Sequence, residues 1–240
     1  MGSWAVEALA RSGVGRLTLI DFDVVKLSNT NRQLHTLSST VERKKFAVMA
    51  ERLADINPDC QVTAIDDFLT LRTLDDYMNP ARGYDYVIDA IDSIKFKAGL
   101  IYHCKRNKIP IITTGGAGGL NDPSAIMVKD LSRTYNDPLA ARVRNKLRKD
   151  YGYTTNPKRY FGVECVFSAQ QPLYPKEDGT VCARKPGIHG VSLDCRFGYG
   201  SAMYVTSTFA MLAVSRVINK TVKKREQEKK KKDSASTETL

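Results

Sequence analysis

The chain has 240 residues, of which 42% are hydrophobic and 26% charged, so it can bury a substantial core and has the composition of an ordinary globular protein. This composition excludes a fibrous or wholly disordered chain. The net charge is +11, and residues 222–240 contribute only +3 of it, so the rest of the chain carries +8. Such a charge fits a polyanionic partner such as RNA, although composition alone leaves that partner open.

Segments typical of strands and helices alternate over the first two-thirds of the chain. Residues 17–21 are a short apolar run that ends in a carboxylate, and apolar residues at helical spacing predict a helix over 38–57, which Pro58 ends. Further strands are predicted at 62–65, 86–91 and 109–113. This order predicts an α/β fold with a doubly wound, mostly parallel, Rossmann-like sheet, in which ligands bind at the carboxyl ends of the strands.

The pattern of the last third of the chain predicts a smaller C-terminal α+β portion. A glycine-rich loop at 115–119 is followed by a predicted strand at 125–131 and a basic helix at 138–150. Residues 152–200 are rich in Gly and Pro and contain short β-like pieces such as 163–168. A final helix is expected to end near Lys220, because the charge density beyond it is typical of disorder. We therefore expect one domain over 1–220 and a disordered basic tail over 221–240.

The cysteines and one uncharged stretch bear on where the chain resides. Five cysteines, an odd number without a Cys-x-x-Cys pair, favour a reduced cytoplasmic setting with mostly buried thiols. Residues 197–215 carry no charge, which raises a membrane-associated alternative through a helix over 197–219. Glycine, serine and threonine dilute this stretch, so a buried helix is favoured. The Lys-rich segment after it would suit a cytoplasmic flank, so membrane contact stays open as the alternative.

Two acidic residues and a glycine are candidates for nucleotide binding. Gly2 precedes a helical pattern, as at the end of a glycine-rich loop that brings backbone N–H groups to phosphates. Asp21 lies nineteen residues later at the end of a strand, where an acidic residue can bind a ribose, and Asp23 follows on the same loop. A lone glycine near the first residue and a solvated strand end are equally ordinary readings of these positions.

Further candidates are polar residues in the segments 28–33 and 89–93 and on the following helix. Arg32 and Lys45 can both reach phosphate groups, Arg with a planar fork of donors and Lys as a point charge. Asp92 ends an otherwise apolar strand, where a carboxylate can hold Mg²⁺ against the phosphates of ATP. The structural alternatives are a polar loop, a charged helix face and a helix-capping aspartate.

Taken together, these motifs resemble those of the adenylyltransferases related to ubiquitin-activating enzymes. Within that ThiF/MoeB-type superfamily the chain looks like the tRNA threonylcarbamoyladenosine dehydratases, over nearly its whole length to about Lys220. The resemblance rests on the motifs Ile20-Asp21-Phe22-Asp23, Asn29-Thr30-Asn31-Arg32-Gln33, Asp89-x-x-Asp92, Thr113-Thr114-Gly115-Gly116, Asp137-Pro138-Leu139-Ala140 and Asp178-Gly179-Thr180-Val181-Cys182.

The resemblance implies ATP-dependent dehydration of N6-threonylcarbamoyladenosine in tRNA, a ligase-type reaction in which AMP activates a carboxylate and ring closure then expels it. It implies ATP and Mg²⁺ as cofactors, tRNA as substrate, a homodimer and a sulfur-transfer partner protein. Clustered positive charge suits this chemistry better than a protein nucleophile does. The implied catalytic residues are Arg32, Lys45 and Asp92, with Asp92 on the metal, and the implied nucleotide-binding residues are Gly2, Asp21, Asp23, Asn29, Arg32, Lys45 and Asp92.

Two departures from the family pattern stand out. The family has a strand and a full glycine loop before Gly2, so we expect this sequence to be N-terminally truncated and the chain as given to be inactive. Glu42 stands where the family usually has Gly, which is expected to perturb the loop that carries Lys45.

Three rival functions remain open on the sequence alone. One is an adenylyltransferase for a ubiquitin-like or sulfur-carrier protein, although the paired Cys-x-x-Cys zinc ligands often found there are missing from the sequence. The second is a tRNA-binding relative without catalysis, and the third a nicotinamide-dependent dehydrogenase. Cys165, Cys182 and Cys195 are candidates for a reactive thiol, with buried structural thiols as the favoured reading.

Overall fold

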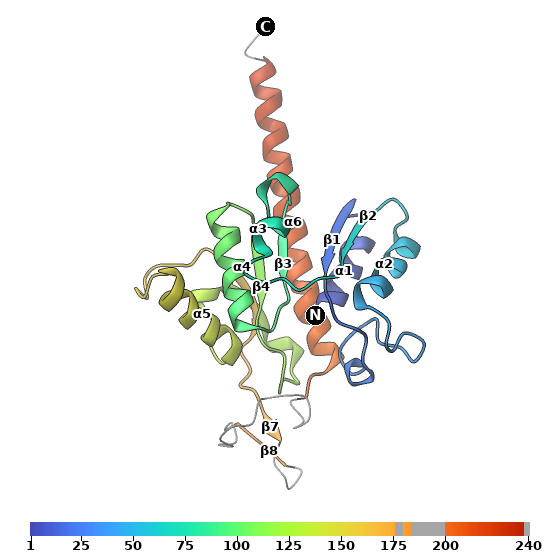
Figure 1. The fold of residues 1–240 in the computed structure, drawn as a ribbon. Coiled ribbons are helices and arrows are strands. Elements are labelled where there is room, and N and C mark those ends of the chain that lie inside the picture. The colour runs from blue at the N-terminus through green and yellow to red at the C-terminus, as the bar shows by residue number, and fades with distance from the viewer. Residues whose placement is uncertain (176–179, 184–199, 238–240) are drawn as a thin grey trace.

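The computed structural model describes residues 1–175, 180–183 and 200–237 of a mixed α/β fold (Figure 1). The strands are β1 (Arg16–Ile20), β2 (Gln61–Ile65), β3 (Val87–Asp89), β4 (Ile111–Thr114), β5 (Ile126–Asp130), β6 (Glu164–Ser168), β7 (Tyr174–Pro175) and β8 (Val181–Cys182). The α-helices are α1 (Gly2–Arg11), α2 (Lys45–Ile56), α3 (Leu74–Tyr77), α4 (Ile94–Arg106), α5 (Pro138–Tyr151) and α6 (Met203–Thr237).

The described strands form two main sheets that are not hydrogen-bonded to each other. β1 and β2 form a parallel pair, and the second sheet has the order β3-β4-β6-β5, in which β5 alone is antiparallel. In Figure 1 the pair β1–β2 stands apart from β3 and β4, with α6 between them in this view. The predicted α/β class with a mostly parallel sheet is confirmed, and the short antiparallel pair β7–β8 belongs to the C-terminal portion.

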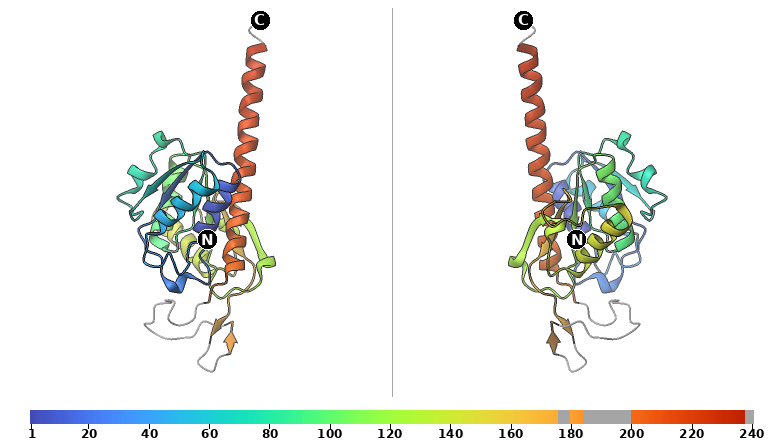
Figure 2. Two further views of the ribbon diagram at one scale, coloured as in Figure 1. Left: turned by 90° about the vertical axis from the view of Figure 1, so that its right-hand side faces the viewer. Right: turned by 90° about the vertical axis from the view of Figure 1, so that its left-hand side faces the viewer.

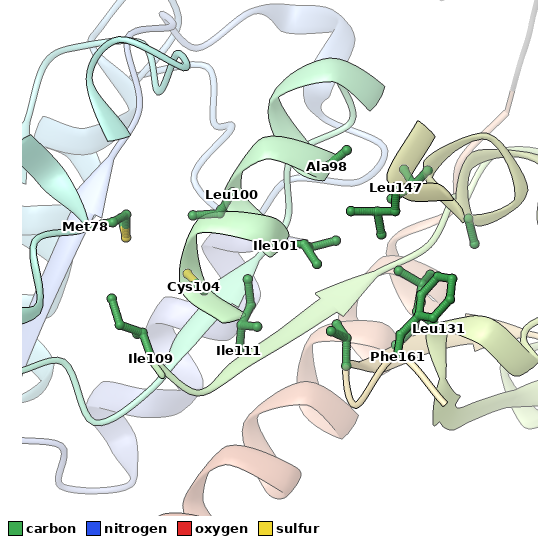
Figure 3. Packing of buried hydrophobic residues seen from close by; sticks show 14 of the residues in the cluster. Met78, Ala98, Leu100, Ile101, Cys104, Ile109, Ile111, Leu131, Leu147 and Phe161 are labelled. Atoms are coloured by element: carbon green, nitrogen blue, oxygen red, sulfur yellow. The ribbon is translucent and has the colours of Figure 1, made fainter. Parts of the chain in front are cut away.

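Helices cover both faces of the four-stranded sheet, as a doubly wound fold requires. α4 and α5 pack against each other on one face, where α4 meets β4, while α6 contacts β4, β5 and β6 on the other and also packs against α1. The larger core lies under α4 and α5 (Figure 3), and its fully buried members include Ile101, Cys104 and Leu147. A second cluster buries Phe209 and Ala213 of α6 against Ile112 and Val166 of the sheet.

The helix predicted over 38–57 begins later, at Lys45, so its predicted start is wrong. Residues 38–42 form turns, and the backbone of the segment 42–44 pairs with residues 24–25 after β1 rather than within a helix. Val25 donates to the carbonyl oxygen of Arg43 (2.8 Å) and accepts from the N–H of Glu42 (2.9 Å). Glu42 has a φ of 67°, a left-handed conformation that a helix interior does not accommodate. The loop before Lys45 therefore carries backbone strain at Glu42, where the sequence departs from the pattern of the family that it resembles.

The final helix continues to Thr237, so its predicted end near Lys220 is corrected, and residues 221–237 are helical rather than disordered. Lys, Arg, Glu and Gln are strong helix formers, which the charge-density argument neglected. Beyond Val222 the described side chains are exposed, and α6 extends away from the rest of the molecule (Figure 2). None of the described helices has the length and apolar character needed to cross a membrane.

Candidate active site

The start of α1, the loop after β3 and the segment 27–36 meet at the carboxyl edge of the strands. A Cβ atom on Gly2 would lie 3.9 Å from Cβ of Ala90, so the start of α1 adjoins the end of β3. The indole Nε1 of Trp4 donates to the carbonyl oxygen of Arg32 (3.0 Å), and Thr206 Oγ1 of α6 donates to the same oxygen (3.0 Å). Helices at opposite ends of the chain thus fix the backbone of Arg32.

Two of the predicted cations face the start of α1. The pKa of the Met1 amino group falls to about 6, first because the group is buried and then because of the positive charges of Arg32 and Lys45. Lys45 is 9% exposed and begins α2, where its backbone N–H donates to the carbonyl oxygen of Asp23 (3.0 Å). The structure therefore brings Arg32 and Lys45 near the start of α1, the helix that begins at Gly2. A helix N-terminus and two cations favour an anion there.

The two acidic residues after β1 differ in their surroundings. Asp21 accepts from the backbone N–H of Asp23 (2.9 Å), and burial raises the pKa of Asp21 against the opposing effects of that hydrogen bond and of Lys45. Asp23 forms an ion pair with Lys45, with Oδ2 and Nζ 2.7 Å apart. Asp23 therefore holds the side chain of Lys45 in place. The role of Asp23 in nucleotide binding stays a prediction.

Arg32 and Asn29 lie on one short turn segment. The guanidinium Nη1 of Arg32 donates to the carbonyl oxygen of Ser28 (2.8 Å) and to Oδ1 of Asn31 (2.9 Å), which restrains a half-buried side chain. Asn29 is 7% exposed, and its Oδ1 accepts from the backbone N–H of Lys26 (3.3 Å). This contact supports the turn that carries Arg32, so the prediction that Asn29 shapes the phosphate site has a structural basis in the backbone it stabilises.

Asp92 lies on the loop between β3 and α4, with an exposed side chain. Among the described residues, no group of three or more His, Cys, Asp or Glu side chains is placed to hold a metal ion. A single exposed carboxylate at this edge fits Mg²⁺, since that ion is commonly held by one or two carboxylates together with phosphate oxygens of the substrate. It does not fit a metal held by protein ligands alone.

A buried ion pair at the end of β3 was not predicted. Asp89 and Lys97 are each 1% exposed, with Oδ2 and Nζ 2.8 Å apart. The same carboxylate accepts from Thr113 Oγ1 (2.6 Å) and from the backbone N–H of Ile91 (3.0 Å), so it fixes the loop that leads to Asp92. The sequence did contain a signal for this pair, a lysine on the apolar face of the helix 94–106. Since a lysine is rarely fully buried without a partner, such a position predicts a buried acidic residue nearby.

Buried polar atoms also gather just after Arg32, and the sequence analysis missed them. His35 is 5% exposed, and neither ring nitrogen has a hydrogen-bond partner in the structure; the same holds for Oγ1 of Thr36 and Oε1 of Gln33. Burial, and then the charge of Lys45, lowers the pKa of His35 to about 4, so the ring is neutral near pH 7. A single histidine in a polar loop gave no signal, because its burial depends on contacts between distant segments.

An apolar wall completes the carboxyl edge beside Asp21. Phe22 follows β1, Phe68 follows β2 and Phe96 lies on α4, and successive ring centroids are 4.8 Å apart in edge-to-face geometry. The row links the two sheets where no backbone hydrogen bond joins them. Rings, cations and a carboxylate at one edge can hold an aromatic base, a ribose and phosphates in sequence.

Among the three candidate thiols, Cys165 is the one that the structure buries. Burial raises the pKa of Cys165, which is 1% exposed, and raises the pKa of Cys104 to about 12. Cys60, Cys104 and Cys165 are free thiols. Cys195 lies outside the described residues. The preference for structural thiols therefore holds for Cys165, since the reactive form of cysteine is the thiolate.

A mostly parallel sheet with cations and a helix N-terminus at its carboxyl edge defines a nucleotide-binding protein of the Rossmann-like class. The ThiF family model matches residues 1–237, and the chain belongs to the ThiF family. It is 52% identical over 225 residues to the tRNA threonylcarbamoyladenosine dehydratase of Escherichia coli (strain K12), covering 93% of this chain and 83% of that protein.

Solved structures agree with this assignment. The structure of TcdA (CsdL) matches with a TM-score of 0.85 and 50% identity, covering 94% of this chain and 84% of that one. The E. coli tRNA N6-threonylcarbamoyladenosine dehydratase in complex with ATP matches with a TM-score of 0.82 and 48% identity, covering 95% and 84%. The resemblance drawn from the motifs is confirmed.

Proposed function

We propose that this protein catalyses the ATP-dependent dehydration of N6-threonylcarbamoyladenosine in tRNA through an acyl-adenylate. The observation that carries the proposal is the placement of Arg32 and Lys45 at the start of α1, beside the loop that leads to Asp92, in a chain 52% identical to an enzyme of that name. The related structure with bound ATP supports the nucleotide.

The residues act on charge in this proposal. An oxygen of the substrate carboxylate attacks the α-phosphorus and pyrophosphate leaves; ring closure then expels AMP, so the nucleoside loses one water. Arg32 and Lys45 stabilise the negative charge that develops on the phosphates, and Asp21 holds the ribose. The ion pair with Asp23 keeps Lys45 in place before ATP binds. Buried lysine and restrained arginine side chains lose little conformational freedom at the reaction step.

Mg²⁺ belongs to the proposal, with Asp92 as its protein ligand. When bound, the ion would neutralise phosphate charge and help pyrophosphate to leave. The buried pair of Asp89 and Lys97 positions the loop on which Asp92 stands. This arrangement supports the metal role of Asp92 without further protein ligands from the described residues.

Further proposals concern assembly and location. We propose a homodimer, supported by exposed apolar side chains on α6 at Tyr204 and Met211 (47% and 44% exposed). The free thiols in the described residues support a reducing, cytoplasmic setting. A sulfur-transfer partner stays a prediction from the family resemblance.

The test is turnover on tRNA that carries the linear modification. We expect an upstream-extended version of the chain to cleave ATP to AMP and pyrophosphate, and mass spectrometry of the digested tRNA to show the nucleoside lighter by one water. ADP as product, or an unchanged nucleoside mass, would contradict the proposal. Pyrophosphate exchange that depends on a ubiquitin-like or sulfur-carrier protein instead of tRNA would favour the rival adenylyltransferase.

A further inference from the structure

A basic groove lies at the amino-terminal edge of the four-stranded sheet, opposite the candidate active site. It has a volume of about 430 Å³ and is formed by the segments that lead into β3, β4 and β6 together with the middle of α6. We call it the amino-edge groove, and its charged lining residues are Asp85, Lys105, Lys108, Glu164, Lys220 and Lys224.

Neighbouring cations already neutralise the two acidic residues of the amino-edge groove. Glu164 pairs with Arg216 (2.5 Å) and with Lys220 (2.9 Å), and Asp85 pairs with Arg225 (2.9 Å). Lys108 is exposed at the rim. The groove therefore presents an excess of positive charge, because its carboxylates are matched or outnumbered by the cations around them.

Helix α6 joins this groove to the candidate active site. Thr206 near its start donates to the carbonyl oxygen of Arg32, and Lys220 lies fourteen residues further on, about 21 Å along a helix that rises about 1.5 Å per residue. Beyond Thr221 the helix is exposed and carries Lys223, Lys224 and Arg225. Arg225 pairs with Asp85, and Lys224 lies 3.8 Å from the carboxylate of Glu228. One rigid element thus carries a row of cations away from the site.

We propose that the amino-edge groove and the exposed basic part of α6 bind the phosphate backbone of the RNA whose modified base enters the active site. The inference rests on the proposed function and assigns the surface that holds the substrate. Its lysines are exposed point charges on flexible stems, which suit a phosphate chain held without reading its sequence. A single small anion would instead call for a buried, converging set of donors.

The test compares two full-length triple variants that lose the same charge. The groove variant carries Lys108→Asn, Lys223→Gln and Lys224→Gln; Asn suits position 108, where φ is 57°. The control variant carries Arg72→Gln, Arg142→Gln and Lys158→Gln, at exposed positions outside the groove lining. Binding of purified tRNA is followed by fluorescence anisotropy between low and moderate salt.

We expect the groove variant to bind tRNA about tenfold or more weakly, with a shallower salt dependence, because each lost phosphate contact removes about 0.7–0.9 from the slope of log K against log salt. Its KM for tRNA should rise while kcat is retained. Binding and KM equal to those of the control variant would overturn the proposal. So would tighter binding of wild type to phosphatidylserine vesicles than to tRNA, lost in the groove variant.

The two proposals fail in different ways. If the upstream-extended wild-type chain binds tRNA through the groove but leaves the modified nucleoside unchanged, the proposed reaction falls and the RNA surface stands. If it dehydrates the nucleoside and the groove variant matches the control variant, the surface falls and the reaction stands.

Discussion

Arg32 and Asp92 are the side chains whose removal should cost turnover without costing the fold. Arg32 is half-buried, and its backbone, not its side chain, accepts the bonds from α1 and α6; Asp92 is exposed on a loop. We expect Arg32→Ala and Asp92→Ala to lower kcat about a hundredfold or more, because both groups act most strongly on charge that develops during reaction.

Initial rates of AMP formation at saturating ATP and tRNA measure this effect, with thermal melting to confirm the fold. Arg16→Ala, at the exposed start of β1, is the matched control and should keep wild-type rates. Rates near wild type in either site variant would remove that residue from the site.

His35 should make stability depend on pH. Its pKa falls from 6.5 to about 4 in the folded protein, chiefly through burial, so the unfolded chain takes up the proton first as pH drops. The stability that the neutral ring of His35 gives the folded state is fully present above about pH 6.5. The free energy of unfolding then decreases as pH falls toward 4, by up to about 1.4 kcal/mol per pH unit.

The measurement is urea unfolding of wild type and His35→Phe between pH 7 and pH 4. The phenyl ring fills the volume and carries no proton, so the difference between the two proteins should shift in favour of the variant as pH falls. A difference that is constant with pH would show that His35 keeps its ordinary pKa.

At the scale of elements, the pair of Asp89 on β3 and Lys97 on α4 should dominate local stability. Lys97→Met leaves a buried carboxylate without its cation, and breaking such a pair typically costs about 3–5 kcal/mol. Chemical denaturation measures the loss. The double variant Lys97→Met with Asp89→Asn should recover part of this loss, since the uncompensated charge is then gone. A loss of unfolding free energy in the double variant larger than the summed losses of the two single variants would contradict this account.

At the scale of the whole molecule, the sheet is divided between β1 and β3. Each of these strands has a partner on one side among the described strands, β2 for β1 and β4 for β3, and the start of α1 lies beside Ala90 at the end of β3. An additional parallel strand that leads into α1 would join the two sheets and bring its loop to Arg32 and Lys45. We propose that upstream residues supply this strand, in line with the family pattern.

The expected outcome is that an upstream-extended chain melts at a higher temperature and binds ATP with Mg²⁺ more tightly than residues 1–240 alone. Strand pairing and backbone donors for the phosphates come from the same segment, so both properties should change together. Differential scanning and titration calorimetry on the two lengths compare them. Tight ATP binding by residues 1–240 would show that the phosphate site is built without that segment.

The sequence by itself determined the α/β class, the mostly parallel sheet and the edge of that sheet, at the carboxyl ends of the strands, where a site is expected. Alternating apolar runs encode these features locally, through the periods of strand and helix. The same holds for α5, predicted over 138–150 and found at Pro138–Tyr151 with the Asp137 side chain as its N-cap. The sequence also indicated Arg32 and Lys45 as candidate site residues, because its motifs resemble those of a known family.

Only the tertiary structure decided which partners these residues take. Residues 42–44 directly precede a helix, yet their backbone pairs with residues 24–25, a contact that no local pattern reveals. Lys97 and His35 are polar by sequence and buried in the fold, since burial depends on segments far apart in the chain. The charge pattern after Lys220 predicted disorder, but α6 continues to Thr237. The Lys, Arg, Glu and Gln residues there have high helix propensity, which the charge pattern does not take into account.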